Sequence, residues 1–243
     1  MAKCNIGDTV FCSSIHLDKN AEVDQAIVEG YVLSLNRKSA SVEFRNGIGI
    51  KTVGTVKLHK NVSFLLIEFG DFVNESANLD PLAKSILAYL RLLISDGSLI
   101  KFIKIRSEQE LGYVLKHYGT YSHIILVGHG SKKGELLVGN DARISSQAFS
   151  ALISAHCASG PTFLSMCCHS GDAAFAKKMS ASGCKAFVGP LGTIHSCSAS
   201  QFVQSFLGHH LLDGLRPKSA FDRARDNTPG STCLRIWRSG KIC

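Results

Sequence analysis

The sequence of 243 residues has no uninterrupted apolar stretch near the ~18 residues that a membrane-spanning helix needs. It has no internal repeat and no low-complexity tract, and no run of Lys and Arg exceeds two residues. These absences argue against a membrane span, a repeat array and a disordered chain. With five prolines, 19% charged and 45% hydrophobic residues, the composition instead indicates a soluble globular protein. At this length the chain can bury a real core in one or two domains.

A secretory signal is also missing, because the opening MAKCNIGDTV lacks a basic segment followed by an apolar one. The cysteines number nine, which is odd, and they are spread from Cys4 to Cys243. A framework of disulfides is therefore not expected, and we predict a cytoplasmic, reducing environment. Most of these thiols should then behave as small buried apolar groups, unless one is placed for chemistry.

Residues 1–60 contain short alternating segments at 28–35, 40–44 and 48–56, separated by turn-like residues. Asn46-Gly47 lies between two of these segments and is a strong hairpin signal. We predict a small β-rich N-terminal module here, either an antiparallel sheet or a barrel. Its basic residues, and the net charge of +8, leave a nucleic-acid partner open as one alternative function.

Residues 61–243 follow a different pattern, in which short apolar runs alternate with amphipathic helical segments. Such alternation predicts βα units around a mainly parallel sheet. The expected strands are 63–69, 100–105, 123–127, 162–166, 185–188 and 234–237. Asp80-Pro81 predicts the start of the first helix, because Asp caps helices and Pro suits their first turn.

Two of the predicted strands end in glycine-bearing turns that carry reactive side chains. The first reads Val127-Gly128-His129-Gly130, and the second reads Cys167-Cys168-His169-Ser170-Gly171. Open α/β sheets build their sites at such strand ends, so neighbouring strands would bring His129 and a cysteine into one crevice. A thiolate can attack a carbonyl, an imidazole can move protons, and glycines let backbone N–H groups approach a developing oxyanion.

These motifs resemble those of the caspase-like (clan CD) cysteine peptidases, in particular the metacaspases and the CHAT group that includes separase-like enzymes. Gly128-His129-Gly130 precedes Cys168-His169-Ser170-Gly171, and C-H-S-G is the nucleophile motif of metacaspases. Downstream, residues 183–190, 202–214 and 219–225 are similar to the CHAT pattern of strand, long helix, glycine and Ala-rich final helix. The resemblance covers about residues 61–230.

The resemblance implies an α/β fold of caspase-like type, a three-layer sandwich with a mainly parallel sheet over residues 61–243. It implies a cysteine endopeptidase in which Cys168 is the nucleophile and His129 the proton-transfer partner. The backbone N–H groups of Gly130 and Cys168 would bind the oxyanion, and a thioester would form without any metal or other cofactor. The implied partners are a protein or peptide substrate and a regulatory protein, with no membrane. A second alignment of the motif would select Cys167 as the nucleophile, so that choice stays open.

Two departures from the family pattern support an alternative, a catalytically silent interaction module with the same fold. Metacaspases have an acidic residue two positions before the nucleophile, where this sequence has Met166. Many CHAT members have an acidic residue in the loop that corresponds to residues 191–196, and this loop has none. Asp141 and Asp172 lie near the motif ends and offer acidic groups for a basic substrate side chain, although Asp172 also suits the start of a helix.

Overall fold

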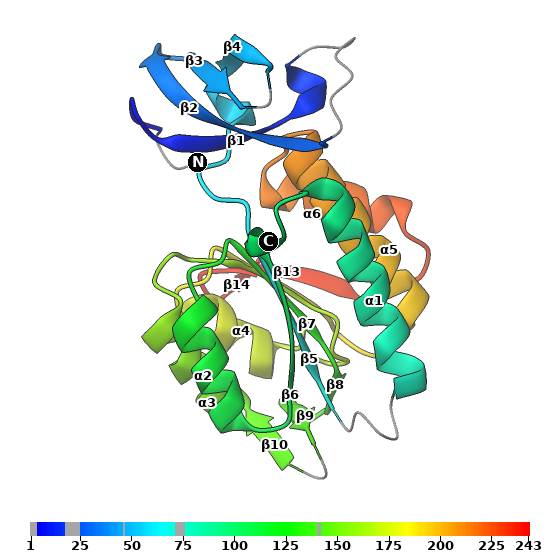
Figure 1. Ribbon diagram of the computed structural model, residues 1–243. Coiled ribbons are helices and arrows are strands. Elements are labelled where there is room, and N and C mark those ends of the chain that lie inside the picture. Colours follow the sequence, from blue (N-terminus) through cyan, green and yellow to red (C-terminus); the bar gives the residue numbers. More distant parts are fainter. Residues whose placement is uncertain (1–3, 18–24, 46, 71–75, 140–141) are drawn as a thin grey trace.

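The computed structural model describes residues 4–17, 25–45, 47–70, 76–139 and 142–243, and it places a small β-rich part beside a larger α/β part (Figure 1). The larger part is built on a seven-stranded sheet of order β14-β13-β12-β11-β7-β5-β6. The five strands from β12 to β6 are parallel, whereas β13 and β14 run antiparallel at one edge. The strands are β5 (Phe64–Phe69), β6 (Ile100–Ile105), β7 (His123–Val127), β11 (Thr162–Ser165), β12 (Ala186–Pro190), β13 (Leu234–Arg238) and β14 (Lys241–Ile242).

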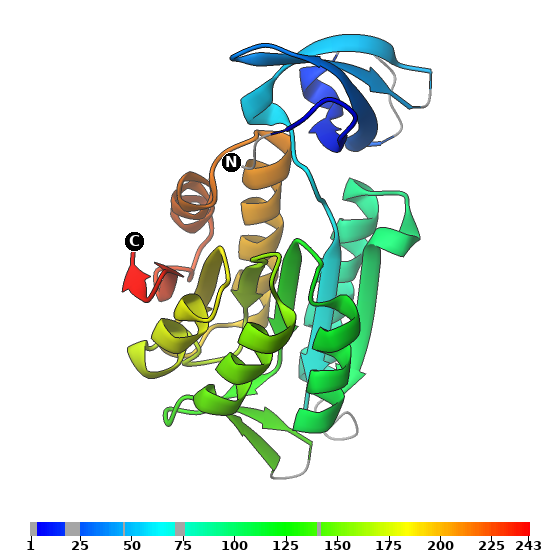
Figure 2. The ribbon, with the colours of Figure 1, turned by 90° about the vertical axis from the view of Figure 1, so that its left-hand side faces the viewer.

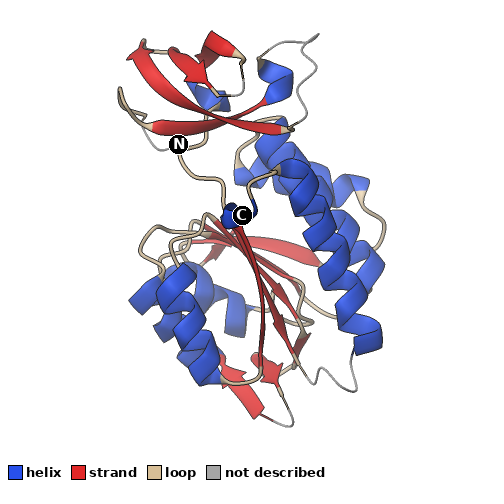
Figure 3. Ribbon diagram, viewed as in Figure 1, coloured by secondary structure: helices blue, strands red, loops and turns tan. Residues whose placement is uncertain are grey.

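Helices cover both faces of this sheet and complete three layers (Figure 3). One face carries α1 (Ser76–Leu93), α5 (Ser196–Leu207) and α6 (Pro217–Asn227), and the other carries α2 (Glu108–Tyr118), α3 (Ser146–His156) and α4 (Ala173–Ala181). A separate apolar core fills the space on each side, and β5, β7, β11 and β12 are buried along their whole length. Strands covered on both faces read as continuous apolar runs, which is why the sequence revealed them. The predicted α/β sandwich with a mainly parallel sheet is confirmed.

The start of α1 differs from the prediction, because the helix begins at Ser76 and includes Pro81 in its interior. Asp80 was expected to cap the helix. Its carboxylate instead binds Lys104 of β6 and pairs with Lys84 at 3.1 Å. Asp80 thus ties the helix to the sheet, and the helix is one turn longer than the proline suggested.

The N-terminal part is an antiparallel sheet of order β1-β2-β3-β4 with a small core of its own. Figure 2 shows it beyond one end of the large sheet, beside the C-terminal end of α5. Its strands are β1 (Thr9–Ser13), β2 (Ile27–Leu35), β3 (Ser39–Phe44) and β4 (Gly49–Gly54), with 3₁₀ turns at Ser14–His16 and Thr55–Lys57. β3 and β4 form the expected hairpin, although Asn46 lies outside the described residues. Residue 60 falls in the segment that leads to β5, and the division into domains 1–60 and 61–243 stays a prediction.

A third sheet, of order β10-β9-β8, was not predicted. Its strands are β8 (His129–Gly130), β9 (Glu135–Val138) and β10 (Ala142–Ser145), and it follows directly after β7. Pairing with β9 therefore holds the backbone of His129 and Gly130 in place. Among the helices that the structure describes, none is long and apolar enough to cross a membrane.

Candidate active site

The two predicted motifs lie at the carboxyl end of the parallel strands, because β7 and β11 are adjacent and parallel. Ser165 is in register with Leu126, and the Met166 N–H donates to the Leu126 carbonyl at 2.8 Å. The chain beyond β11 therefore emerges beside the chain beyond β7. The His129 and Cys168 motifs therefore leave two adjacent strands at the same end of the sheet.

Gly130 brings the backbones of the two motifs into contact. A Cβ built on Gly130 would lie 2.0 Å from the carbonyl oxygen of Cys168, so only a glycine fits at this position. Gly128 is restricted in the same way, since its Cβ would lie 2.9 Å from the Cβ of Phe69. The glycines on either side of His129 thus let the turn approach β5 and the cysteine motif closely. His129 itself is half-buried in β8.

A tight turn holds Cys168 in place. His169 has a φ of 61°, in the left-handed region that non-glycine residues rarely occupy. Its N–H donates to the Gly192 carbonyl at 2.9 Å, and its Nδ1 lies 3.3 Å from a carboxylate oxygen of Asp172. This contact turns the His169 ring toward the helix start, so Asp172 serves the turn instead of capping α4 with its side chain.

The neighbouring strands anchor the same turn from the other side. The Gly171 N–H donates to the Pro190 carbonyl at 2.8 Å, and the indole Nε1 of Trp237 donates to the Gly171 carbonyl at 3.0 Å. A Cβ on Gly171 would lie 2.2 Å from the Gly189 carbonyl oxygen, so this glycine is also required. The turn after β11 is thus packed directly on the end of β12 and tied to β13.

The adjacent thiols of Cys167 and Cys168 occupy different environments. Cys167 is fully buried in the core below α3 and α4, and burial raises the pKa of its thiol to about 12. Cys168 is partly exposed. A buried thiol with such a pKa supplies almost no thiolate near neutral pH and cannot reach a substrate. Of the two sequence alternatives, the geometry favours Cys168.

Two backbone N–H groups beside Cys168 are not used by secondary structure. The Ser131 N–H donates to the Glu135 carbonyl at 2.9 Å, so the next pair, Gly130 with Leu136, is a non-hydrogen-bonded pair of the antiparallel ladder. The Gly130 N–H therefore points away from β9. Within the described part of the chain, no carbonyl or side chain accepts a hydrogen bond from the Cys168 N–H. These are the two groups that the family resemblance assigned to the oxyanion.

The acidic residues that the family resemblance led us to look for are absent, engaged or outside the described residues. Met166 is 3% exposed and packs in the core on the side of α1 and α5. Asp172 is engaged with His169, and Asp141 lies outside the described residues. Over the ranges that the structure covers, no group of three or more His, Cys, Asp or Glu side chains is arranged to hold a metal ion.

Two basic residues of the N-terminal part, Arg45 and Lys57, are engaged within the protein. Arg45 pairs with Glu29 at 3.1 Å and stacks over Tyr31, while Lys57 donates to the Asp213 carbonyl at 2.6 Å. Phe44 is 3% exposed and belongs to the module's core, so it offers no stacking surface. Nucleic-acid binding by this sheet stays a prediction.

Solved structures share this fold, and two of them are C11 cysteine proteases. A secreted C11 cysteine protease from Bacteroides thetaiotaomicron, in complex with an irreversible peptide inhibitor, matches with a TM-score of 0.53 and 9% sequence identity. The match covers 74% of this chain and 66% of that one, slightly less than two thirds of the protease. A structure of a secreted C11 cysteine protease from the same organism, "iotapain", gives a TM-score of 0.50 and 7% identity over 74% and 67% of the two chains. The predicted caspase-like fold is thus confirmed.

No protein-family model matches the sequence, and no curated protein matches it. The function of this chain is therefore argued from its own residues and their geometry.

A cluster of histidines that the sequence did not reveal lies at the opposite end of the same strands. His59, His123 and His210 lie around one pocket there, and they come from the segment before β5, the start of β7 and the turn after α5. No motif joins residues so far apart in the chain. The one hint in the sequence was that His123 stands at the start of the strand that leads into the His129 motif.

Proposed function

We propose that this protein is a cysteine endopeptidase of the caspase-like, CHAT or metacaspase type. Cys168 is the nucleophile, His129 the proton-transfer partner, and the N–H groups of Gly130 and Cys168 bind the oxyanion. The observation that carries the proposal is the backbone contact at Gly130, whose Cβ would lie 2.0 Å from the Cys168 carbonyl oxygen. This contact keeps the half-buried His129 and the partly exposed Cys168 at the same end of the sheet, beside two N–H groups that secondary structure does not use.

The reaction proceeds in two halves. His129 accepts the proton of the Cys168 thiol, and the thiolate attacks the peptide carbonyl carbon to give a tetrahedral oxyanion. Collapse of this intermediate breaks the C–N bond, His129 returns the proton to the leaving amine, and a thioester remains on Cys168. Water then attacks the thioester with His129 as the base, which releases the acid and restores the thiol.

Substrate preference follows from what surrounds the nucleophile. Met166 is buried and residues 191–196 carry no carboxylate, so neither of these two positions supplies an acidic group that would select a basic side chain. We therefore propose a protein or peptide substrate without a strict requirement for Lys or Arg before the cleaved bond. Control by a regulatory protein partner and a cytoplasmic location complete the proposal.

Covalent labelling tests the assignment of the nucleophile. The intact protein is treated with a peptidyl acyloxymethyl ketone, and the adduct is mapped by mass spectrometry. Labelling is expected at Cys168, to be abolished in Cys168→Ala and to slow by roughly 10²–10⁴-fold in His129→Ala, since a general base contributes that much. Turnover of a fluorogenic peptide library should fall in parallel.

The control for this experiment is general alkylation. Cys197 and Cys243 are exposed, so iodoacetamide should modify them first in the wild-type protein. A peptidyl reagent that labels these thiols as readily as Cys168 would refute the proposal. Cys197→Ala is the matched variant, and it should leave labelling at Cys168 unchanged.

A catalytically silent interaction module is the second candidate, and the neutral residues at 166 and 191–196 favour it. This candidate predicts a folded protein that binds a peptide ligand but shows no selective labelling at Cys168. The labelling experiment therefore separates the two functions.

A further inference from the structure

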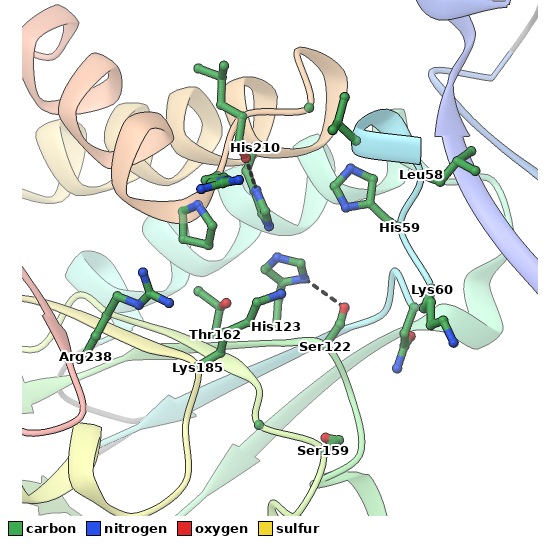
Figure 4. A pocket seen from close by; sticks show the side chains of 17 residues that line it. Leu58, His59, Lys60, Ser122, His123, Ser159, Thr162, Lys185, His210 and Arg238 are labelled. Atoms are coloured by element: carbon green, nitrogen blue, oxygen red, sulfur yellow. Dashed lines mark hydrogen bonds between the residues drawn. The ribbon is translucent and has the colours of Figure 1, made fainter. Parts of the chain in front are cut away.

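A pocket of about 430 Å³ lies at the end of the large sheet opposite to Cys168, between the N-terminal module and the α/β part. Its walls come from the segment that joins the two parts, from the starts of β7, β11 and β12, and from the turn that leads into α6. Figure 4 shows that side chains from these separate elements surround one space. Its size is that of a pocket for a small molecule.

The charged residues that line this pocket all have the same sign. They are Lys60, Lys185, Arg216 and Arg238, and none of the lining residues is acidic. Lys60 is paired with Asp8 at 2.7 Å. Lys185, Arg216 and Arg238 have no carboxylate partner within the described part of the chain. Three cations are thus left without a counter-charge around one space.

Lys185 and Arg238 line the pocket from two neighbouring strands. Lys185 precedes β12, and Arg238 ends the antiparallel strand β13 beside it, where Phe187 is in register with Trp237. Burial, and then the charge of Arg238, lowers the pKa of Lys185. A pair of like charges without a carboxylate between them is unfavourable unless an anion binds there.

Three histidines lie at the inner end of the pocket. The His210 ring stands 5.4 Å from that of His59 and 5.5 Å from that of His123, measured between centroids. His123 is 3% exposed, and its Nε2 is buried with no hydrogen-bond partner within the described residues, as is the Nε2 of His59. An unpartnered buried nitrogen is costly, so these two atoms indicate a ligand that would bond to them.

The first turn of α6 adds to the positive potential. Arg216 is the N-cap residue and Pro217 the first residue of this helix, and both line the pocket. No side chain caps the helix, and its first turn contains no acidic residue. The positive end of the helix dipole is therefore available to an anion, as at many phosphate sites.

From these observations we infer that the pocket binds a small organic molecule that carries two or more phosphate groups. Three unpaired cations and a helix end match several negative charges, and arginine binds phosphate oxygens with two parallel hydrogen bonds. The volume exceeds what one phosphate needs, and Val56, Leu58 and Leu215 offer an apolar wall for an organic body. A small molecule is favoured over a nucleic-acid strand because the residues form a pocket instead of an extended groove.

Binding of inorganic tripolyphosphate to the full-length protein tests this inference, by calorimetry at constant ionic strength. We expect saturable binding with one site, weakened at least tenfold in Lys185→Gln and in Arg238→Gln. Lys116→Gln removes one positive charge from an exposed position on helix α2, and this variant should bind tripolyphosphate as the wild type does. Circular dichroism of each variant verifies that it is folded.

Two further probes identify the ligand class. A nucleoside triphosphate without a metal ion should compete with tripolyphosphate. A single-stranded oligonucleotide should compete more weakly than the nucleoside triphosphate at the same phosphate concentration and ionic strength. Absence of tripolyphosphate binding would overturn the inference, as would equal binding by all variants or a preference for the oligonucleotide. The readout is independent of peptidase activity, so it stands or falls separately from the proposed function.

Discussion

Substituting Gly130 with alanine tests the geometry of the proposed active site without removing any reacting group. The new Cβ would lie 2.0 Å from the Cys168 carbonyl oxygen, whereas ordinary contacts begin at 3.4 Å. The two backbones would have to separate by about 1.4 Å, and misplacement of reacting groups by roughly 1 Å costs about 10²-fold in rate. We therefore expect kcat/KM for a fluorogenic peptide to fall about 100-fold, mainly through kcat.

The control is Gly97→Ala, because no atom lies within 4 Å of the Cβ position of Gly97 and its φ is not positive. This variant should keep wild-type activity. Thermal unfolding of both variants shows whether the Gly130 variant is folded. A folded Gly130→Ala protein with nearly wild-type kcat/KM would refute the argument that this contact sets the distance between His129 and Cys168.

Three further predictions concern stability. Burial of His59 lowers its pKa from 6.5 to about 3, so its stabilising effect is complete above pH 6.5 and is lost as the pH falls toward 3. At pH 5 the free energy of unfolding should be lower by about 2 kcal/mol than at pH 7. Urea unfolding at the two pH values should show a smaller difference in His59→Gln than in the wild type. Lys104→Met leaves Glu68, which is 1% exposed, without its cation at 3.1 Å, and should cost roughly 3 kcal/mol in urea unfolding at pH 7. Trp237→Phe removes the bond to the Gly171 carbonyl, and should cost about 1 kcal/mol in the same assay and lower kcat by loosening the turn.

The sequence predicted the large sheet well, because strands covered on both faces carry uninterrupted apolar residues such as Ile124–Val127. It also placed both motifs in turns beyond neighbouring strands, since glycines close after a strand indicate a close backbone approach or a tight turn. It missed the β8-β9-β10 sheet, whose short strands carry no strong pattern. The predicted start of α1 was wrong because Asp80 pairs with Lys104 of β6, a tertiary contact that the local sequence does not reveal.

The choice between Cys167 and Cys168 illustrates the same limit. The two residues are adjacent, and both alignments of the motif are reasonable in the sequence. Their difference arises from the alternation of side chains at the end of β11, which sends Met166 into one core and Cys167 into the other. Because helices cover both faces of the sheet, alternate side chains enter different cores, and the sequence alone does not show which residue enters which core.

Strands β7 and β11 have one more consequence, because each carries a pocket residue at its start and leads into one of the two candidate active-site motifs. β7 alone spans about 13 Å of extended chain through a closely packed core of low compressibility. If a phosphate-bearing ligand alters peptide binding through these strands, thermodynamic linkage requires the converse. A substrate analogue at Cys168 must then change the affinity of the distant pocket by the same factor, so each site would report on the occupancy of the other.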